Sequence, residues 1–315
     1  MKKSILPVII LTSALALSGC AGKASESAAQ DVAQASKETI KIAYLPITHS
    51  LAVLEEAKAL EENENISVEL VKYGSWPELL DALNSGQVDG ASVLIELAMK
   101  SRAEGIGIKA VALGHRDGNV IVVSNEIEDG SELAGKTIAI PHRQSSHNIL
   151  INDALSLNGL TISDINVVEL APTEMPSALA SGTIDGYCVA EPFGAVGVSV
   201  GVGKVLYESD ELWEDSVCCG LVLTEEFLEE QEAVAKEFVE KYKEAGNNLT
   251  KEEAKAVANE YLSQSEDVID VSLEWISFDD LEITEEMYEE LCEKVINYGL
   301  MDNPPSYEDF VVSDF

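Results

Sequence analysis

The sequence predicts an α/β fold of two similar lobes, each a mainly parallel sheet with flanking helices, followed by a helical C-terminal segment. Two observations carry this prediction. Short β-branched runs alternate with segments of helical apolar spacing, which is typical of βαβ units. The phrase ALNSGQVDGA at 82–91 also returns as ALASGTIDGY at 178–187, which indicates two copies of one structural unit.

The elements follow one another at βαβ spacing. In the first copy we predict strands at 39–44, 66–73, 88–95 and 108–113, and helices at 50–62 and 76–85. From Gly118 the alternation restarts, with strands at 119–124, 136–141, 165–170 and 184–192 and helices at 145–159 and 174–181. After about Glu225 the strand signals fade, and the helical tail is expected to pack back on the first lobe.

The repeated phrase is interpreted as turn chemistry. In each copy a short helix opens near Pro77 or Pro176 and stops at Ser-Gly, where glycine allows the left-handed backbone that ends a helix. The chain then passes through an Asp-Gly pair into a strand that is expected to be buried. We therefore assign the Asp-Gly pair a structural role.

The N-terminus has the features of a bacterial export signal. Two lysines precede an apolar run that is too short to span a bilayer and that ends in Ser-Gly-Cys. Residues 1–19 are predicted to be a signal peptide, and Cys20 resembles the lipobox cysteine of bacterial lipoproteins, which becomes lipidated. Residues 20–37 are mostly Ala, Ser, Gln and charged residues, and they are predicted to form a flexible tether.

The composition is strongly acidic, with 57 Asp and Glu against 20 Lys and Arg and a formal net charge of −37. Nucleic acid and anionic membrane surfaces are therefore poor partners. The carboxylates are densest after Glu208 on helix-like segments, where they are interpreted as a solvated face.

The cysteines beyond Cys20 follow neither the spacing of a disulfide framework nor that of a CxxC metal site. One disulfide is possible and none is required. Buried small apolar side chains are the favoured interpretation of Cys188, Cys218, Cys219 and Cys292.

All four histidines fall in three loops that are predicted to lie at strand ends: PITHS at 46–50, GHRDGN at 114–119 and PHRQSSHN at 141–148. Ligands of open α/β sheets bind beyond the carboxyl ends of the strands, and pockets favour domain interfaces. The histidines therefore predict a polar, donor-rich cleft. In the third loop Ser145 and Ser146 open a helix whose free N–H groups can hold an anion.

Seven phrases, in their order, carry a resemblance to a known family: IKIAYLP, SWPELLDALNSGQVDGA, LGHRDGNVIVVS, LAGKTIAIP, LINDALSLNGLTISDINVVEL, ALASGTIDGYCVAEPF and CGLVLTEEFLEE. Between Lys37 and about Glu244 the chain resembles the extracytoplasmic solute-binding proteins of ABC importers of the nitrate, sulfonate, taurine and bicarbonate type. The resemblance implies a type II periplasmic-binding fold, with a ligand clamped between two lobes. It also implies delivery to a membrane permease with a cytoplasmic ATPase.

The resemblance fixes the expected lobes and their motion. Lobe I is predicted to comprise 38–116 and 226–315 with the C-terminal helices, and lobe II to comprise 117–225. The crossings between the lobes are expected at 114–119 and around 219–224, and the lobes should close on the solute by hinge motion.

The predicted binding residues lie on strand-end loops and helix starts of both lobes: Thr48, His49, Trp76, Glu96, His115, Asn119, His142, Ser145, Ser146, His147 and Glu191. Glu191 is included because AEPF at 190–193 resembles the family's Glu-Pro-aromatic element at the cleft. An ordinary helix start is the alternative there. For Trp76 the alternative is a core residue at a helix start.

The predicted solute is a small anion such as a sulfonate, nitrate or related oxyanion, held by the helix start at 145–147 with His49 and His115 opposite. Lysines are not concentrated near any strand end, so the anion is not fixed. Two alternatives stay open: a thiamine pyrimidine precursor or similar heterocycle, which a related branch of the fold binds, and a metal ion. The metal would be held by a convergence of His49, His115, His142, His147 and Glu191.

The chain is predicted to be a monomer outside the cytoplasm, anchored to the cell membrane by lipidated Cys20, with an ABC permease and its ATPase as partners. No cofactor and no nucleic-acid partner is predicted, and the predicted anion site contains no metal. An enzyme is not expected, because no Ser-His-Asp frame or phosphate loop is present. The Cys218-Cys219 pair is also shorter than the cysteine-rich motif of the pyrimidine-making branch of the fold.

Overall fold

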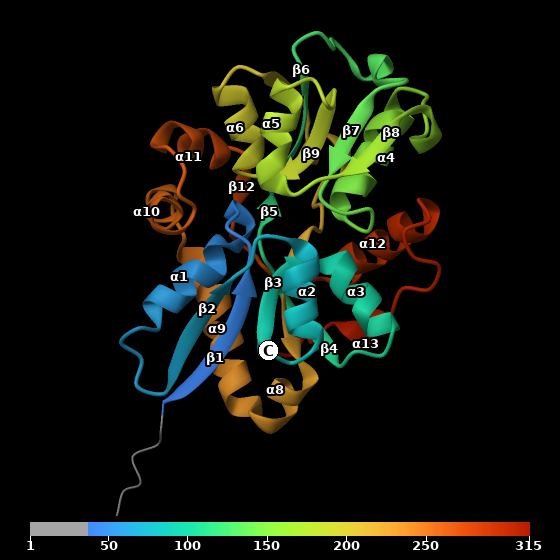
Figure 1. Ribbon diagram of the computed structural model, residues 1–315. Helices are drawn as coiled ribbons and strands as arrows, with labels where there is room; N and C mark the ends of the chain where they lie inside the picture. The colour runs from blue at the N-terminus through green and yellow to red at the C-terminus, as the bar shows by residue number, and fades with distance from the viewer. Residues whose placement is uncertain (1–36) are drawn as a thin grey trace, which may run out of the picture. The chain divides into compact units, whose positions relative to one another are not determined.

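The strands of residues 37–315, the part of the chain that the computed structural model describes, form two five-stranded sheets and one two-stranded sheet (Figure 1). The first sheet has the strand order β2-β1-β3-β11-β4 and the second has the order β10-β6-β9-β7-β8. The predicted signal peptide, Cys20 and all of the tether except Lys37 lie outside the described residues.

The first sheet and its helices make up lobe I. Its elements are β1 (Glu38–Tyr44), α1 (Leu51–Ala59), β2 (Ile66–Lys72), α2 (Trp76–Asn84), β3 (Gly90–Leu94), α3 (Ile95–Ala103), β4 (Ile108–Leu113) and β11 (Cys219–Thr224). Strand β1 pairs in parallel with β2 and β3, and β11 runs antiparallel to both β3 and β4. Strand β3 is buried along its whole length, as a central strand covered on both faces should be.

The second sheet makes up lobe II. Its elements are β6 (Asn119–Ser124), β7 (Thr137–Ile140), α4 (Ser146–Leu157), β8 (Asn166–Glu169), α5 (Met175–Ala180), β9 (Gly186–Ala190), α6 (Phe193–Ser199), β10 (Gly203–Glu208) and α7 (Ser209–Leu212). Strand β7 pairs in parallel with β8 and β9, and β6 runs antiparallel to both β9 and β10. In each sheet the fourth strand from the β2 or β8 edge is therefore the reversed one, which confirms that the lobes are similar.

The reversed strand of the first sheet, β11, moves the second predicted lobe boundary. The first crossing contains β5 (Arg116–Asp117), which pairs with β12 (Ile276–Ser277), and it lies where the sequence predicted it. Residues 219–224, which were expected at the second crossing within lobe II, instead form β11 of the first sheet. The chain returns to lobe I between α7 and β11, along 213–218.

The C-terminal helices contact both lobes, whereas packing on the first lobe was expected. They are α8 (Glu225–Glu230), α9 (Glu232–Asn248), α10 (Lys251–Tyr261), α11 (Glu266–Ser272), α12 (Glu285–Asn297) and α13 (Tyr307–Phe310). Helices α9 and α10 pack against α1, but α11 packs against α6 of lobe II. In addition, Lys294 of α12 forms an ion pair of 3.0 Å with Asp153 of α4.

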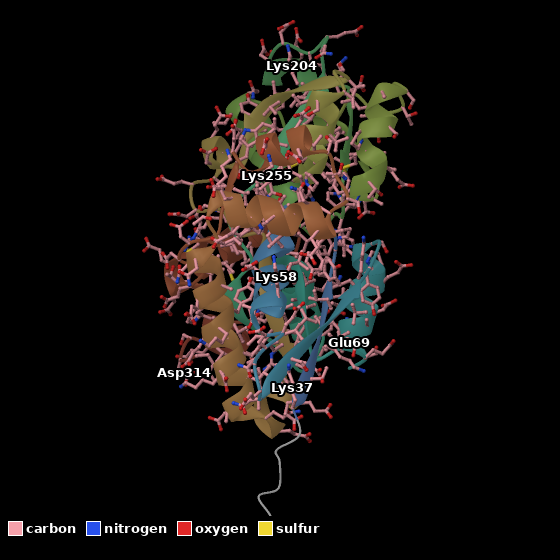
Figure 2. All side chains as sticks on the ribbon, turned by 90° about the vertical axis from the view of Figure 1, so that its left-hand side faces the viewer. Lys37, Lys58, Glu69, Lys204, Lys255 and Asp314 are labelled. Atoms are coloured by element: carbon pink, nitrogen blue, oxygen red, sulfur yellow. The ribbon has the colours of Figure 1, made fainter. Side chains whose placement is uncertain are left out.

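Oxygen-tipped side chains surround the ribbon (Figure 2), and most carboxylates of the C-terminal helices are exposed. On α9, Phe238 and Tyr242 are buried, whereas Glu240 and Glu244 are exposed. The acidic excess is thus a solvated face here, as predicted. No helix among residues 37–315 is both long enough and apolar enough to cross a membrane.

The repeated Asp-Gly pair has the same structural role in both lobes. In lobe I the Asp89 carboxylate accepts a hydrogen bond from the backbone N–H of Lys41 at 2.8 Å, and in lobe II Asp185 accepts from Thr137 at the same distance. Each aspartate also donates its own N–H to the carbonyl of that partner, at 2.9 and 2.8 Å. The aspartate therefore ties the start of one strand to its parallel neighbour.

The glycines of the phrase serve two different purposes. Gly86 and Gly182 end their helices at φ values of 69° and 71°, in the left-handed region that glycine adopts without strain. Gly90 and Gly186 begin strands. A Cβ atom added at Gly90 would lie 2.8 Å from the Val222 carbonyl oxygen, and one added at Gly186 would lie 2.9 Å from the Val122 carbonyl oxygen. The second pair therefore allows close approach of the reversed strand.

We expect Gly90→Ala to lower the free energy of unfolding by about 1–3 kcal/mol, because the new methyl group would overpack against Val222 and Leu223. Urea denaturation measures this. Gly74→Ala is the matched control, since a Cβ there meets only Glu78, at 3.9 Å. Equal stabilities of the two variants would contradict the packing argument.

Candidate functional site

The site forms where four neighbouring strands of the first sheet end. His49 lies in the 3-10 turn that follows β1, Glu96 lies in the first turn of α3 after β3, and His115 follows β4. Strand β11 runs antiparallel, so its first residue, Cys219, lies at this same edge and pairs with Leu94 at the end of β3. Reversal of one strand thus brings a cysteine pair to the edge where the histidines lie.

Four buried side chains converge there. The Sγ atom of Cys218 lies 3.7 Å from Nδ1 of His49 and 3.8 Å from Sγ of Cys219, and the Sγ atom of Cys219 lies 3.6 Å from the same Nδ1. One ring nitrogen of His115 completes a group whose donor atoms all lie within 4.8 Å of one another. None of the four residues is more than 1% exposed. We refer to His49, His115, Cys218 and Cys219 as the four-donor group.

The backbone fixes the orientation of the histidines. Nε2 of His49 donates a hydrogen bond to the Gly118 carbonyl at 2.9 Å, so that the unprotonated Nδ1 faces the thiols. His115 stacks on His49 with ring centroids 3.5 Å apart. A Cβ atom at Gly114 would lie 3.0 Å from the His49 carbonyl oxygen, so glycine permits this close approach. A nitrogen held in this way is suited to binding a metal.

The electrostatics separate the two thiols. Burial opposes ionisation of Cys218, but the hydrogen bond from Cys219 and the neighbouring His49 and His115 lower the pKa of Cys218 well below its ordinary value. Burial and the adjacent Cys218 raise the pKa of Cys219. Burial, and then His49, lower the pKa of His115 to about 4. The lowered pKa of Cys218 favours its thiolate, and the lowered pKa of His115 favours its neutral imidazole, and these are the forms that bind metals.

Lobe II faces this group with polar side chains that have unused hydrogen-bonding atoms. His147 and Ser146, in the first turn of α4, are 0% exposed, and neither ring nitrogen of His147 nor the Ser146 hydroxyl has a hydrogen-bond partner among the described residues. Burial is the main cause that lowers the pKa of His147 to about 4. Asn119 accepts a hydrogen bond from the Cys218 thiol at 3.7 Å.

Two of the predicted site residues are buried carboxyl groups. Neither carboxyl oxygen of Glu96 has a hydrogen-bond partner in the described chain, and burial, followed by the nearby Cys218, raises its pKa well above the ordinary value. Glu191 accepts a hydrogen bond from the Ala195 N–H at 3.1 Å through one oxygen only, and burial raises its pKa to about 8. Glu191 therefore keeps its proton at slightly acid pH.

The remaining predicted residues are Thr48, Trp76, His142 and Ser145, and none of them belongs to the four-donor group. Thr48 joins the lobes, because its N–H and its hydroxyl donate to the Glu191 carbonyl at 2.9 and 3.0 Å. Trp76 is buried at 2% exposure with an unpartnered indole N–H within residues 37–315. His142 is only half-buried, accepts a hydrogen bond from Gln144, and lies outside the four-donor group. Ser145 is buried and donates to the His142 carbonyl.

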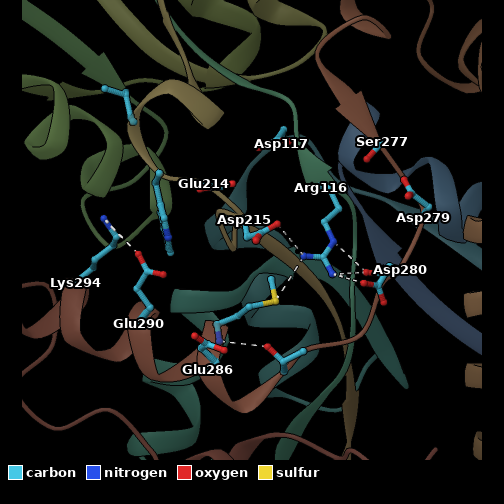
Figure 3. Close-up of a pocket in the computed structure, with 14 residues that line it drawn as sticks. Arg116, Asp117, Glu214, Asp215, Ser277, Asp279, Asp280, Glu286, Glu290 and Lys294 are labelled. Atoms are coloured by element: carbon cyan, nitrogen blue, oxygen red, sulfur yellow. Dashed lines mark hydrogen bonds and ion pairs between the residues drawn. The ribbon is translucent and has the colours of Figure 1, made fainter.

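The two arginines of the histidine-bearing loops are engaged elsewhere. Arg116 lines a separate pocket of about 820 Å³ beside the crossings, where its guanidinium lies between Asp215 and Asp280 (Figure 3). Asp215 lies on the second crossing, so this ion pair joins the two crossings to each other. Arg143 donates to the Val167 carbonyl at 2.7 Å. The donors nearest the four-donor group are therefore neutral.

Sequence reasoning identified both histidines of the four-donor group and missed its cysteines. Cys218 and Cys219 are buried in the hydrophobic core, as interpreted, and their thiols in addition face His49. The available signal was a vicinal cysteine pair directly before an apolar strand-like run. The cysteine pair indicates a binding site only when β11 is known to belong to lobe I.

The comparisons with known proteins agree with this architecture. The NMT1-like family matches residues 33–263, which is well over half of the chain. The chain belongs to the NMT1-like family. This NMT1-like chain is 41% identical to the ligand-binding component of an ABC-type import system from Staphylococcus aureus, solved with zinc bound. That comparison has a TM-score of 0.85 and covers 88% of this chain and 97% of the other.

More distant relatives confirm the resemblance and the fold. The nitrate-binding protein NrtA from Synechocystis PCC 6803 has a TM-score of 0.77 at 17% identity, over 88% of this NMT1-like chain and 87% of that one. The bicarbonate transport ATP-binding protein CmpC of Synechocystis is 25% identical over 201 residues, which are 57% of this chain. The match spans only 30% of the length of that relative. The two-lobed periplasmic-binding fold predicted from the sequence is confirmed.

Proposed function

We propose that this protein is the solute-binding component of an ABC import system and that its solute is a thiophilic divalent metal ion such as Zn²⁺. The observation that carries the proposal is the buried four-donor group of two imidazoles and two thiols. Membership of the NMT1-like family and the zinc in the Staphylococcus aureus relative support it. Two nitrogen and two sulfur donors in this arrangement suit tetrahedral zinc.

The distances within the group agree with one central ion. In a tetrahedral site with Zn–S of ~2.3 Å and Zn–N of ~2.05 Å, two sulfurs lie about 3.8 Å apart and a sulfur lies about 3.5 Å from a nitrogen. The Cys218–Cys219 sulfurs are 3.8 Å apart, and their separations from His49 Nδ1 are 3.7 and 3.6 Å. Three of the donors can therefore bind one ion with little rearrangement.

The charge of the group also favours a divalent cation. Two thiolates neutralise Zn²⁺, which leaves no net charge in a site where an unbalanced charge would be costly. An anion would instead meet the Cys218 sulfur, whose pKa is lowered, and its nearby donors would include the neutral imidazoles of His115 and His147. The overall acidity of the chain, at a formal net charge of −37, likewise attracts cations to the surface.

The proposal is tested with the full-length protein, purified under reducing conditions without a metal-affinity tag. We expect one equivalent of Zn²⁺ per chain by elemental analysis. Its removal should lower the thermal midpoint, because ligand at a hundred times its Kd stabilises the fold by about 2.7 kcal/mol. Nitrate and a short alkanesulfonate are titrated in parallel. Absence of Zn²⁺ binding, together with a saturable shift by either anion, would refute the metal.

The anion predicted from the sequence is the second candidate. It is favoured by the helix start at Ser146 and His147, whose hydroxyl and ring nitrogens have no partners within the described chain, and by relatives named for nitrate and sulfonates. The parallel titrations separate the two candidates. The heterocycle alternative would appear as a retained organic ligand in mass spectrometry of the gently purified protein.

The cellular setting is part of the proposal. Solute-binding components of this kind work outside the cytoplasm, and the signal-like N-terminus with Cys20 supports a lipid tether there. We propose that the protein acts as a monomer and passes its solute to an ABC permease with its ATPase. No enzymatic activity is proposed, since the named relatives are transport proteins. Fatty-acid labelling that is present in the natural protein and lost in Cys20→Ser would establish the anchor, and equal labelling of both would exclude it.

A further inference from the structure

We infer that His147 supplies the metal's ligand from lobe II, so that the bound ion joins the two lobes through this side chain. The inference rests on the proposed function. All members of the four-donor group belong to lobe I or to the ends of the crossings. A metal held by them alone would bind without engaging lobe II. A contact from the other lobe is therefore what would couple binding to closure.

His147 is the side chain of lobe II that is placed for this role. It is 0% exposed, both of its ring nitrogens lack a hydrogen-bond partner in the described chain, and it lies near enough to Cys218, His49 and His115 to interact with them electrostatically. A buried imidazole with no partner is costly in free energy, and a metal ion or its bound water is a partner that satisfies it. The hydroxyl of the adjacent Ser146 is likewise unused.

The position of His147 is well supported by its surroundings. It lies in the first turn of α4, and Asp153 further along this helix pairs with Lys294 of α12 at 3.0 Å and accepts a hydrogen bond from Tyr298. The loop before α4 is fixed by the hydrogen bond from Ser145 to His142. The imidazole is therefore presented by a rigid element, as the ligand of a closing lobe should be.

Hydrogen exchange of the full-length protein, with and without Zn²⁺, tests the inference. In the wild type, Zn²⁺ should slow exchange both at 114–119 of the crossing and at 141–150 of lobe II. In His147→Ala, Zn²⁺ should still slow exchange at 114–119, but protection at 141–150 should be lost and the affinity should fall about tenfold. His147→Gln, which keeps a polar side chain, should behave in the same way and guards against a folding defect.

His142→Ala is the matched control, since it removes an imidazole from the same loop outside the four-donor group, and it should respond like the wild type. Zn²⁺-dependent protection of 141–150 in both His147 variants at wild-type level would overturn the inference. Protection confined to lobe I in the wild type would also overturn it and leave the proposed function intact. A wild type that binds no Zn²⁺ would instead refute the proposed function.

Discussion

Cys219→Ser should lower the affinity of the protein for Zn²⁺ by about 10²–10³-fold. Structural zinc sites gain about 10–16 kcal/mol from four ligands, so one ligand contributes on the order of 3–4 kcal/mol. The serine hydroxyl keeps the shape of the side chain but stays protonated at neutral pH and is a poor zinc ligand. The Cys219 sulfur lies 3.6 Å from His49 Nδ1, which places it in the group that the variant disrupts. Competition with a chromophoric chelator measures the change.

Cys188→Ser is the control for this experiment. Cys188 is also fully buried, in β9 of lobe II, and lies outside the four-donor group, so the same chemical change should leave the affinity for Zn²⁺ within about threefold of the wild type. Losses of equal size in the two variants would indicate a general effect on folding. An undiminished affinity in Cys219→Ser would remove the thiol from the site.

The lobes could be predicted from the sequence because their signals are local. The Ser-Gly helix stop and the Asp-Gly strand entry depend on backbone conformation over a few residues, and both recur at the same place in each lobe. The position of the second lobe boundary depends on contacts between residues far apart in the sequence. Residues 219–224 resemble any apolar strand, and their return to lobe I depends on pairing with β3 and β4, far away in the chain.

The same distinction applies to the site. The histidines could be predicted because parallel strands bring their carboxyl ends to one edge, so loops after strands are candidates. Cys218 and Cys219 precede a strand, and by that rule they should lie at the opposite edge. The antiparallel course of β11 reverses the rule and places them beside His49. Arg116 also lies in a loop after a strand, as the rule requires. Its guanidinium nevertheless pairs with Asp215 and Asp280, and no sequence pattern indicated this pairing.

Glu191→Gln should change how the stability of the metal-free protein depends on pH. Burial raises the pKa of Glu191 to about 8 in the folded chain, from an ordinary value of 4.5. The folded state therefore holds a proton that the unfolded state has released, and stability falls as pH rises from about 4.5 to about 8. This one group contributes a slope of about −1.4 kcal/mol per pH unit in that window.

Glutamine cannot ionise. Between about pH 5 and 8 the free energy of unfolding of Glu191→Gln should therefore fall less steeply than that of the wild type, by about 1.4 kcal/mol per pH unit. The two free energies of unfolding should be equal near pH 5, and that of the variant should be several kcal/mol larger at pH 8. At pH 8 the folded wild type must either keep the Glu191 proton or bury a charged carboxylate, one oxygen of which has no partner in the described structure. Urea denaturation with chelator present measures both slopes. Glu69→Gln removes an exposed carboxylate and should leave the slope unchanged. Parallel curves for the wild type and Glu191→Gln would mean that the Glu191 carboxylate is solvated in the metal-free protein and would contradict the prediction.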